Sequence, residues 1–358
     1  NYFINTAKEK YANGSISGAD ADIKHYMGEG YFMRALEYYF RLRTLGDFPI
    51  ITETLPDDQA VLTAASQRRP RNEVARFIVA NLDTAITYLK NDMGKTRISK
   101  NAALLLKSRV ALYEATWEKY HAGTAMVPNG PGWLGSTKDY LKNYQYDANN
   151  EITYFLQQAM DASSQVADAV QLTENNSSIR QTAADAVNPY YDMFASHDPR
   201  SYSEVIMCRL FKDGVSTHHF NHYMYSGGNT GYTRQFEKTF LMKNGLPIYA
   251  AGSGYAGDDY IADTKKDRDE RWQLFMYAPG QAKAVENIST IEYFPDAPQV
   301  YKADSKNATS TGYIQGKGHS MDYSDQILGR DQTAFVVYRA AEAYLNYIEA
   351  SYELNGNI

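Results

Sequence analysis

The chain has 358 residues, with 36 Lys and Arg against 42 Asp and Glu, and a formal net charge of −6. A chain of this length buries enough surface to fold without disulfides, and its single cysteine, Cys208, excludes an intramolecular disulfide and a cysteine-based zinc site. The acidic balance without a basic run excludes a typical nucleic-acid partner, because such proteins need clustered Lys and Arg to displace counterions from phosphates.

Three helices are expected in the first 120 residues. The first lies within residues 22–45, where apolar side chains recur at helical spacing, and it ends at the Gly-Asp-Phe-Pro sequence of residues 46–49. The second begins near Asn72 and ends between residues 91 and 94. The third follows Ser99, which is a good N-cap residue, and forms an antiparallel hairpin with the second.

Two further helices complete the periodic set, one from about Glu151 and one from about Ala334. Paired helices of this kind favour a mainly α fold with tetratricopeptide-like helical pairs. We expect a single body over 1–358, incomplete at both ends. Its helical scaffold is predicted over 20–120, 151–187 and 334–356, and long irregular, loop-rich insertions over 121–150 and 188–333. Long loops in compact proteins tend to carry function.

No catalytic, metal or nucleotide motif stands out. His218 and His222 have the spacing of a zinc pair, but glycines nearby indicate a loop without a third ligand. The segment around Ser253 lacks the pattern of a nucleophile elbow, and no phosphate-binding loop is present. We therefore expect no enzyme activity, no metal and no cofactor.

Aromatic residues dominate the two insertions, and the whole chain has 31 Tyr, 14 Phe and 3 Trp. Flat rings beside polar side chains suit a sugar, because pyranoses present apolar C–H faces and a rim of hydroxyls. Rings at glycine-rich tips are poorly placed to join a core. The predicted ligand-binding residues are Trp133, Tyr223, Tyr225, Tyr232 and Tyr255, with Asn229, Arg234 and Asp258 as polar partners.

Five ordered segments resemble motifs of one protein family. Residues 28–36 and 46–50 are similar to its GEARFLRA helix and GDVPL exit, and residues 69–86 are similar to RxEVY followed by DLxxAI. Residues 97–110 resemble GRxTKxAALALKARV, and residues 244–280 resemble the succession NGLPI, RDPR and PG. Residues 338–350 resemble RLAEVYLNYAEA. Together these segments resemble the SusD/RagB family of surface glycan-binding lipoproteins of Bacteroidota.

The resemblance implies non-catalytic binding of oligosaccharide or polysaccharide at the cell surface and delivery to a TonB-dependent outer-membrane transporter of SusC type. It also implies an N-terminal lipid anchor, whose cysteine this chain does not contain. The motif residues Glu29, Arg34 and Asp47 are expected to cap or pair within the scaffold, and Arg268 with Arg271 to hold a loop in place, rather than to contact sugar. The alternative is a tetratricopeptide-like protein-interaction scaffold without direct glycan binding.

Overall fold

The computed structural model describes residues 1–226, 228–294, 300 and 309–356, and these form two compact units. The helical unit consists of Asn1–Leu172 with Tyr338–Ile358, and the loop-rich unit consists of Thr173–Val337. The unit boundaries therefore lie at 172/173 and 337/338, whereas the sequence placed the change from scaffold to insertion at 187/188 and 333/334. The mainly α class is confirmed.

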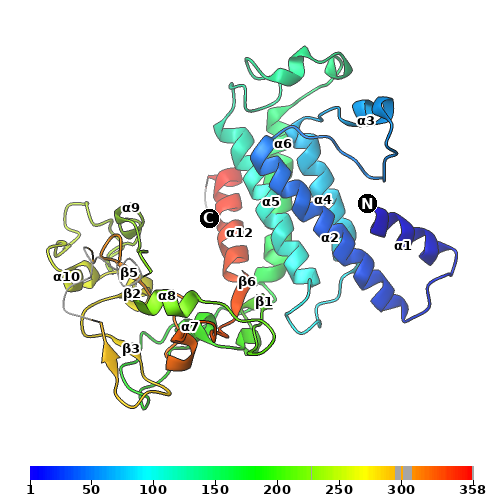
Figure 1. Cartoon of the computed structure of the whole chain (residues 1–358). Helices are drawn as coiled ribbons and strands as arrows, with labels where there is room; N and C mark the ends of the chain where they lie inside the picture. The colour runs from blue at the N-terminus through cyan, green and yellow to red at the C-terminus, as the bar shows by residue number, and fades with distance from the viewer. Residues whose placement is uncertain (227, 295–299, 301–308, 357–358) are drawn as a thin grey trace. The chain divides into compact units, whose positions relative to one another are not determined.

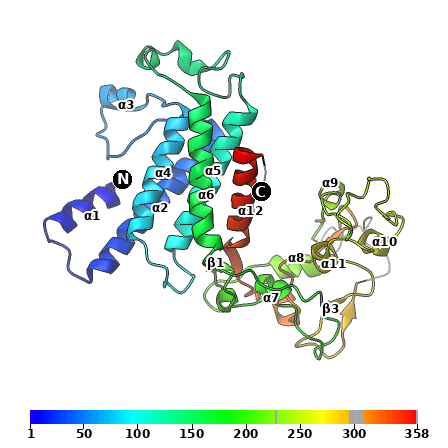
Figure 2. The same cartoon turned by 180° about the vertical axis from the view of Figure 1, so that it is seen from behind.

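Five long helices lie side by side in the helical unit (Figures 1 and 2). They are α2 (Asp20–Leu45), α4 (Arg71–Tyr88), α5 (Lys100–Tyr120), α6 (Ala148–Ala167) and α12 (Ala341–Asn355). In the packing order, α2 contacts α4, α4 contacts α5, α5 contacts α6, and α6 contacts α12. The helices expected from periodicity are thus all present, but the last begins at Ala341 rather than near Ala334, because residues Phe335–Arg339 form a strand.

Local sequence explains where these helices begin, end and meet. The side chain of Ser99 accepts a hydrogen bond from the backbone N–H of Ala102, as expected for the N-cap of α5. Gly46 ends α2 with a φ of 67°, a value that glycine adopts without strain. Gly28 lets α2 approach the end of α4, because a Cβ at this position would lie 2.9 Å from Leu89.

The core of the helical unit combines apolar stripes with paired charges. The apolar side chains that lie fully buried between the helices include Ala35, Leu42, Ile78, Leu82, Leu106, Val110, Phe155 and Ala159. Arg71 on α4 forms two hydrogen bonds with Glu114 on α5, at 2.7 and 2.8 Å, with both side chains buried. Arg109 on α5 pairs with Glu342 on α12 at 2.5 Å. These pairs fix how neighbouring helices align.

Short helices in the helical unit were not predicted. They are α1 (Tyr2–Ala12), α3 (Gln59–Ala65) and the 3₁₀ turns η1 (Leu134–Thr137) and η2 (Asp139–Leu141). The predicted fourth helix begins three residues earlier than expected, at Ala148, because Asp147 caps it. No helix in the described ranges is both long and apolar enough to cross a membrane.

The loop-rich unit is built from short elements. Its helices are α7 (Pro189–Ala195), α8 (Phe220–Ser226), α9 (Arg234–Glu237), α10 (Ile261–Lys265) and α11 (Glu270–Phe275), with 3₁₀ turns η3 (Pro199–Ser201) and η5 (Tyr323–Gln326). Strand β2 (Met276–Tyr277) pairs antiparallel with β5 (Ile314–Gln315), and β3 (Ala282–Ala284) with β4 (Glu292–Tyr293). Strand β1 (Val205–Arg209) pairs with β6 (Phe335–Arg339). Trp272, Met276 and Tyr313 form a buried apolar cluster among these elements.

Candidate functional site

Four of the predicted site residues meet in the loop-rich unit, around α9. The guanidinium of Arg234 contacts Asp258 at 2.6 Å and donates a hydrogen bond to the Tyr313 hydroxyl at 2.8 Å. The hydroxyl of Tyr255 faces the same guanidinium. Tyr232 packs its ring on Trp272, with the ring centroids 5.6 Å apart. The structure therefore brings Tyr232, Arg234, Tyr255 and Asp258 together.

The polar groups of this cluster have defined protonation states. Burial lowers the pKa of Arg234, but the nearby hydroxyls of Tyr255 and Tyr313, of which Tyr313 accepts a hydrogen bond, and the charge of Glu237 outweigh this effect and raise the pKa above its usual value. Burial raises the pKa of Tyr232 to about 12. Arg234 is thus a fixed cation, and the Tyr232 hydroxyl keeps its proton at neutral pH.

Exposed rings flank this cluster along the chain. Phe236 on α9 is 45% exposed, although its ring also touches Tyr232 at a centroid distance of 5.4 Å. Tyr260 follows Asp258 by two residues, caps the start of α10 and is 74% exposed. We define the α9 surface as these rings and charges: Tyr232, Arg234, Phe236, Tyr255, Asp258 and Tyr260. The exposed Phe236 ring lies on the same short helix as Arg234, which forms the ion pair with Asp258.

Three predicted residues take no part in the contacts of this surface. The hydroxyl of Tyr225 donates to Glu292, and its ring lies 4.5 Å from the ammonium of Lys283. Tyr223 lies on α8 with 45% of its surface exposed. Asn229 is exposed in a turn with a φ of 53°. Only their exposure or their aromatic side chains support these three residues as candidates for ligand binding.

Trp133 requires a correction. We expected this ring to be exposed at a glycine-rich tip, but it is only 5% exposed. Its indole N–H donates to the Asp47 carboxylate at 2.8 Å, and its ring packs against Tyr144. The expectation was wrong because the loop folds back onto the end of α2. Trp133 belongs to the helical unit, whereas the residues of the α9 surface belong to the loop-rich unit.

A cavity of about 280 Å³ in the loop-rich unit escaped prediction. The ring of Tyr191 lines it, stacked on Phe275 with an interplanar angle of 17°. Arg180 and Glu286 form an ion pair at 2.7 Å in its wall. None of the eight predicted residues lines it. The sequence feature that could have indicated this region is the Asn188-Pro189 pair, which is typical of a helix start. It precedes two tyrosines within the segment that was predicted as a loop.

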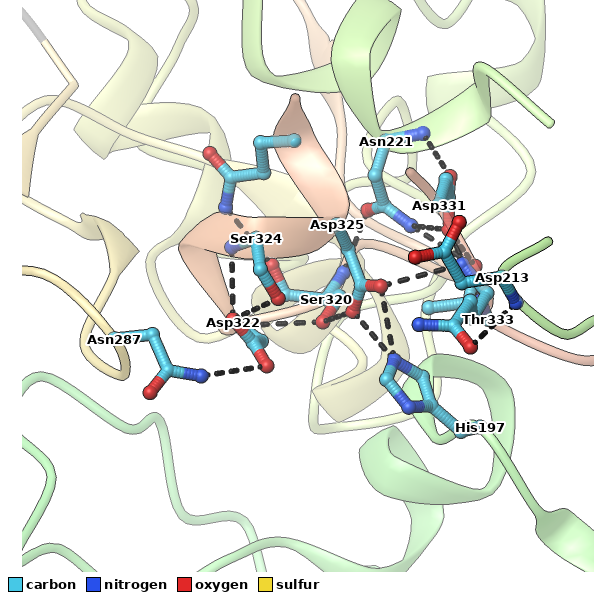
Figure 3. Close-up of polar contacts among 12 residues, drawn as sticks. His197, Asp213, Asn221, Asn287, Ser320, Asp322, Ser324, Asp325, Asp331 and Thr333 are labelled. Carbon is cyan, nitrogen blue, oxygen red and sulfur yellow. Dashed lines mark hydrogen bonds and ion pairs between the residues drawn. The ribbon is translucent and has the colours of Figure 1, made fainter. Parts of the chain in front are cut away.

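A polar network adjoins this cavity (Figure 3). His197 and Asp325 both line the cavity and form an ion pair at 2.8 Å, and Ser320 donates to the same carboxylate at 2.7 Å. The hydrogen bond that His197 donates to the Asp325 carboxylate raises the pKa of His197. For Asp325, burial raises the pKa, but the bonds from His197 and Ser320 outweigh it and leave the pKa below its usual value.

The same network continues away from the cavity. The Asn221 amide, fully buried on α8, donates to Asp331 at 3.2 Å and to Thr333 at 3.0 Å, and its oxygen accepts from the backbone N–H of Ser320 at 2.7 Å. A buried amide with donors and acceptors in use stabilises the surrounding loops. We therefore interpret the network as a structural one that holds the loops of the loop-rich unit in place.

Comparison with known proteins shows which family the chain resembles. The profile of the SusD family matches residues 212–357, and a second profile, described as starch-binding and associating with the outer membrane, matches residues 4–112. Both parts of the chain therefore match profiles of one kind. Residues 4–112 and 212–357 of the chain are thus similar to SusD-like proteins. This confirms the resemblance drawn from the five sequence motifs.

Relatives of this chain differ in how much they share with it. SusD-like protein P2 of Formosa agariphila is 32% identical over 114 residues, which are 32% of this chain and 21% of that protein. A SusD-like protein from Bacteroides fragilis has a similar fold, with a TM-score of 0.62 and 18% identity over 99% of this chain and 63% of the other. A crystal structure with xylogluco-oligosaccharide has a TM-score of 0.52 and 16% identity, covering 98% and 57%. The chain thus spans less than two thirds of these proteins.

His218 and His222, which have the spacing of a zinc pair, contact other groups in the structure. His218 contacts the Asp331 carboxylate and the carbonyl of Thr333, and His222 contacts the carbonyl of Gln326. Within the described residues, no group of three or more His, Cys, Asp or Glu side chains is arranged to hold a metal ion.

Proposed function

We propose that this protein binds oligosaccharide or polysaccharide without cleaving it, at the outer membrane, and delivers it to a TonB-dependent transporter of SusC type. The observation that carries the proposal is the α9 surface in a chain similar to SusD-like proteins. This similarity adds support, since one matching profile is described as starch-binding and a protein of similar fold was crystallised with xylogluco-oligosaccharide.

The α9 surface has the chemistry that a sugar requires. The exposed faces of Phe236 and Tyr260 can pack on the C–H faces of a pyranose. Arg234 and Asp258 then offer donors and acceptors to the ring hydroxyls. Because Arg234 is already held by three partners, binding costs little ordering of that side chain.

The carboxylates of this surface support binding rather than hydrolysis. Glycosidases use one carboxyl group as a proton donor and a second as nucleophile or base on opposite sides of one bond. Here Asp258 and Glu237 both contact the Arg234 guanidinium, at 2.6 and 3.2 Å, and Glu237 is fully buried. A buried, ion-paired carboxylate is poorly placed to reach a glycosidic bond.

The test compares ring variants of the α9 surface with a matched ring elsewhere. Tyr260→Ala and Phe236→Ala should each weaken binding to a retained polysaccharide about fivefold, since a stacked ring contributes ~1 kcal/mol beyond burial. Tyr2→Ala removes a ring that is 73% exposed in the helical unit and should leave binding unchanged. Affinity electrophoresis against a polysaccharide panel measures the effect, and melting temperatures report folding.

Two outcomes would contradict the proposal. If wild-type protein is retarded by no polysaccharide and binds a SusC-type transporter regardless of added glycan, the protein is an interaction scaffold. If both ring variants bind like wild type, the glycan site lies elsewhere.

A further inference from the structure

A hollow of about 450 Å³ in the helical unit lies where α2 ends. Its wall combines the last turn of α2 and the start of α4 with part of the loop over 125–141, including the buried edge of Trp133. Its volume falls in the range of ~300–1,000 Å³ that is typical of small-molecule sites. The α9 surface belongs to the other unit, so this hollow is a separate candidate site.

Basic side chains outnumber acidic ones in the lining. Arg43, Arg68 and Lys138 are all exposed here, and in the described part of the chain none of them forms an ion pair with a carboxylate. Arg71 lines the base, where Glu114 already neutralises it. Three uncompensated cations around one hollow stand out in a chain with a net charge of −6. Such a grouping attracts an anion.

The single acidic residue in the lining does not cancel this charge. One oxygen of Asp47 accepts the indole N–H of Trp133 at 2.8 Å, and the other accepts the backbone N–H of Arg71 at 2.9 Å. Burial raises the pKa of Asp47, against the effect of these bonds. Because both oxygens of its carboxyl group already accept hydrogen bonds from the wall, Asp47 repels a bound anion only weakly.

Apolar surface lies next to the cations. Leu134 is 75% exposed, Leu45 is 45% exposed, and the ring of Tyr140 is 38% exposed. A ligand that is complementary to the whole hollow has an anionic group on one side and an apolar face on the other. A pyranose that carries a carboxylate or a sulfate has both features.

We propose that this hollow binds an anionic sugar residue, with Arg43, Arg68 and Lys138 contacting its carboxylate or sulfate and Tyr140 and Leu134 facing its ring. The inference rests on the proposed glycan-binding function and names the class of glycan. Trp133 and Asp47 are positioning residues here, because they shape the wall that carries the cations.

The test measures binding of three probes by calorimetry: an oligogalacturonate, a sulfated carrageenan oligosaccharide and a neutral cello-oligosaccharide. The first two separate a carboxylate from a sulfate as the recognised group. Wild-type protein should bind one of them, and the Arg43→Gln/Arg68→Gln variant should weaken that binding at least about tenfold, since charge-assisted hydrogen bonds to the anion are lost. Lys8→Gln/Lys10→Gln changes the net charge equally on exposed residues of α1 and should bind like wild type.

The outcomes distinguish this inference from the proposed function. Binding of an anionic probe that is unaffected by Arg43→Gln/Arg68→Gln overturns the anionic site, as does binding of poly-glutamate in place of either anionic sugar. Binding of the neutral probe alone also overturns it, while the proposed glycan function stands. If no polysaccharide or probe binds wild-type protein, both proposals fail together.

Discussion

At the scale of single residues, the family motifs have structural roles in this molecule. Arg34 donates two hydrogen bonds to Asn81, and Glu29 pairs with Arg97. Arg268 is fully buried and bonds to Glu237 and to backbone carbonyls of the loop-rich unit. The expectation that such motif residues stabilise the scaffold is confirmed, so ligand contacts must be sought in the residues between motifs.

Trp133 shows which property of a single residue cannot be predicted from the sequence, namely its long-range partner. Its glycine-rich neighbourhood was read correctly as a turn, but its partner Asp47 lies 86 residues earlier in the chain. A long-range hydrogen bond of this kind leaves no local pattern. By contrast, Arg234 and Asp258, which contact each other, were both predicted as site residues. They were predicted because polar residues that lie between aromatic ones in the sequence are expected to share one surface with them.

The burial of Trp133 predicts a loss of stability on substitution. Trp133→Ala should lower the free energy of unfolding by about 3–5 kcal/mol, because a buried ring is removed. Trp133→Phe keeps most of the ring but leaves an Asp47 oxygen without its donor, and should cost about 1–3 kcal/mol. Denaturant unfolding followed by circular dichroism measures both. Tyr140→Ala in the same loop serves as the exposed control, and equal stability of all three variants would contradict the observed burial.

At the scale of elements, periodicity predicted the long helices and missed the short ones. Helices α2, α4, α5, α6 and α12 have between 15 and 26 residues, which is enough for an apolar stripe to repeat. The helices of the loop-rich unit have four to seven residues and show no such repeat. Their positions depend on tertiary contacts, such as the Asn221 network, which sequence spacing does not encode.

Helix α5 carries two buried acids one turn apart, and this predicts an unusual pH dependence. Burial and the neighbouring Glu114 raise the pKa of Glu118 to about 9, although the Tyr146 hydroxyl bonds to it. The folded state therefore holds a proton that the unfolded chain releases above its ordinary pKa of about 4.5. This contribution to stability is full below pH 4.5 and decreases as the pH rises toward 9.

Glu118→Gln imitates the protonated side chain at every pH. The variant should be more stable than wild type at pH 8, by an amount on the order of a few kcal/mol, and the difference should shrink toward pH 4.5. Unfolding midpoints in denaturant across this range provide the measurement. Glu349→Gln on α12 is an exposed control. A variant that is less stable than wild type at pH 8 would show that Glu118 is ionised in the folded protein.

At the scale of the whole molecule, the helical unit is assembled from two separate segments of the chain. Its last helix, α12, packs on α5 and α6 although the loop-rich unit lies between them in sequence. The Tyr344 hydroxyl on α12 bonds to the carbonyls of Ala167 and Val170, just before the chain leaves the unit. The points of departure and return are thus close together.

This arrangement predicts that the helical unit folds without the loop-rich unit. Residues 1–172 joined to 338–358 by a short glycine–serine linker should give a helical protein with one cooperative thermal transition in circular dichroism. Residues 1–172 alone should melt at a lower temperature, because faces of α5 and α6 lose α12. Non-cooperative melting of the joined protein would mean that the helical unit depends on the rest of the chain.

The nearness of Val170 to Tyr344 also bears on how such proteins diversify. When both ends of an insertion are pinned at one place, lengthening it costs little, since loop-closure entropy grows only with the logarithm of length. Residues added or exchanged between these anchor points leave the helical packing unchanged. The sequence of the loop-rich unit can therefore change between relatives while the helical packing is inherited intact.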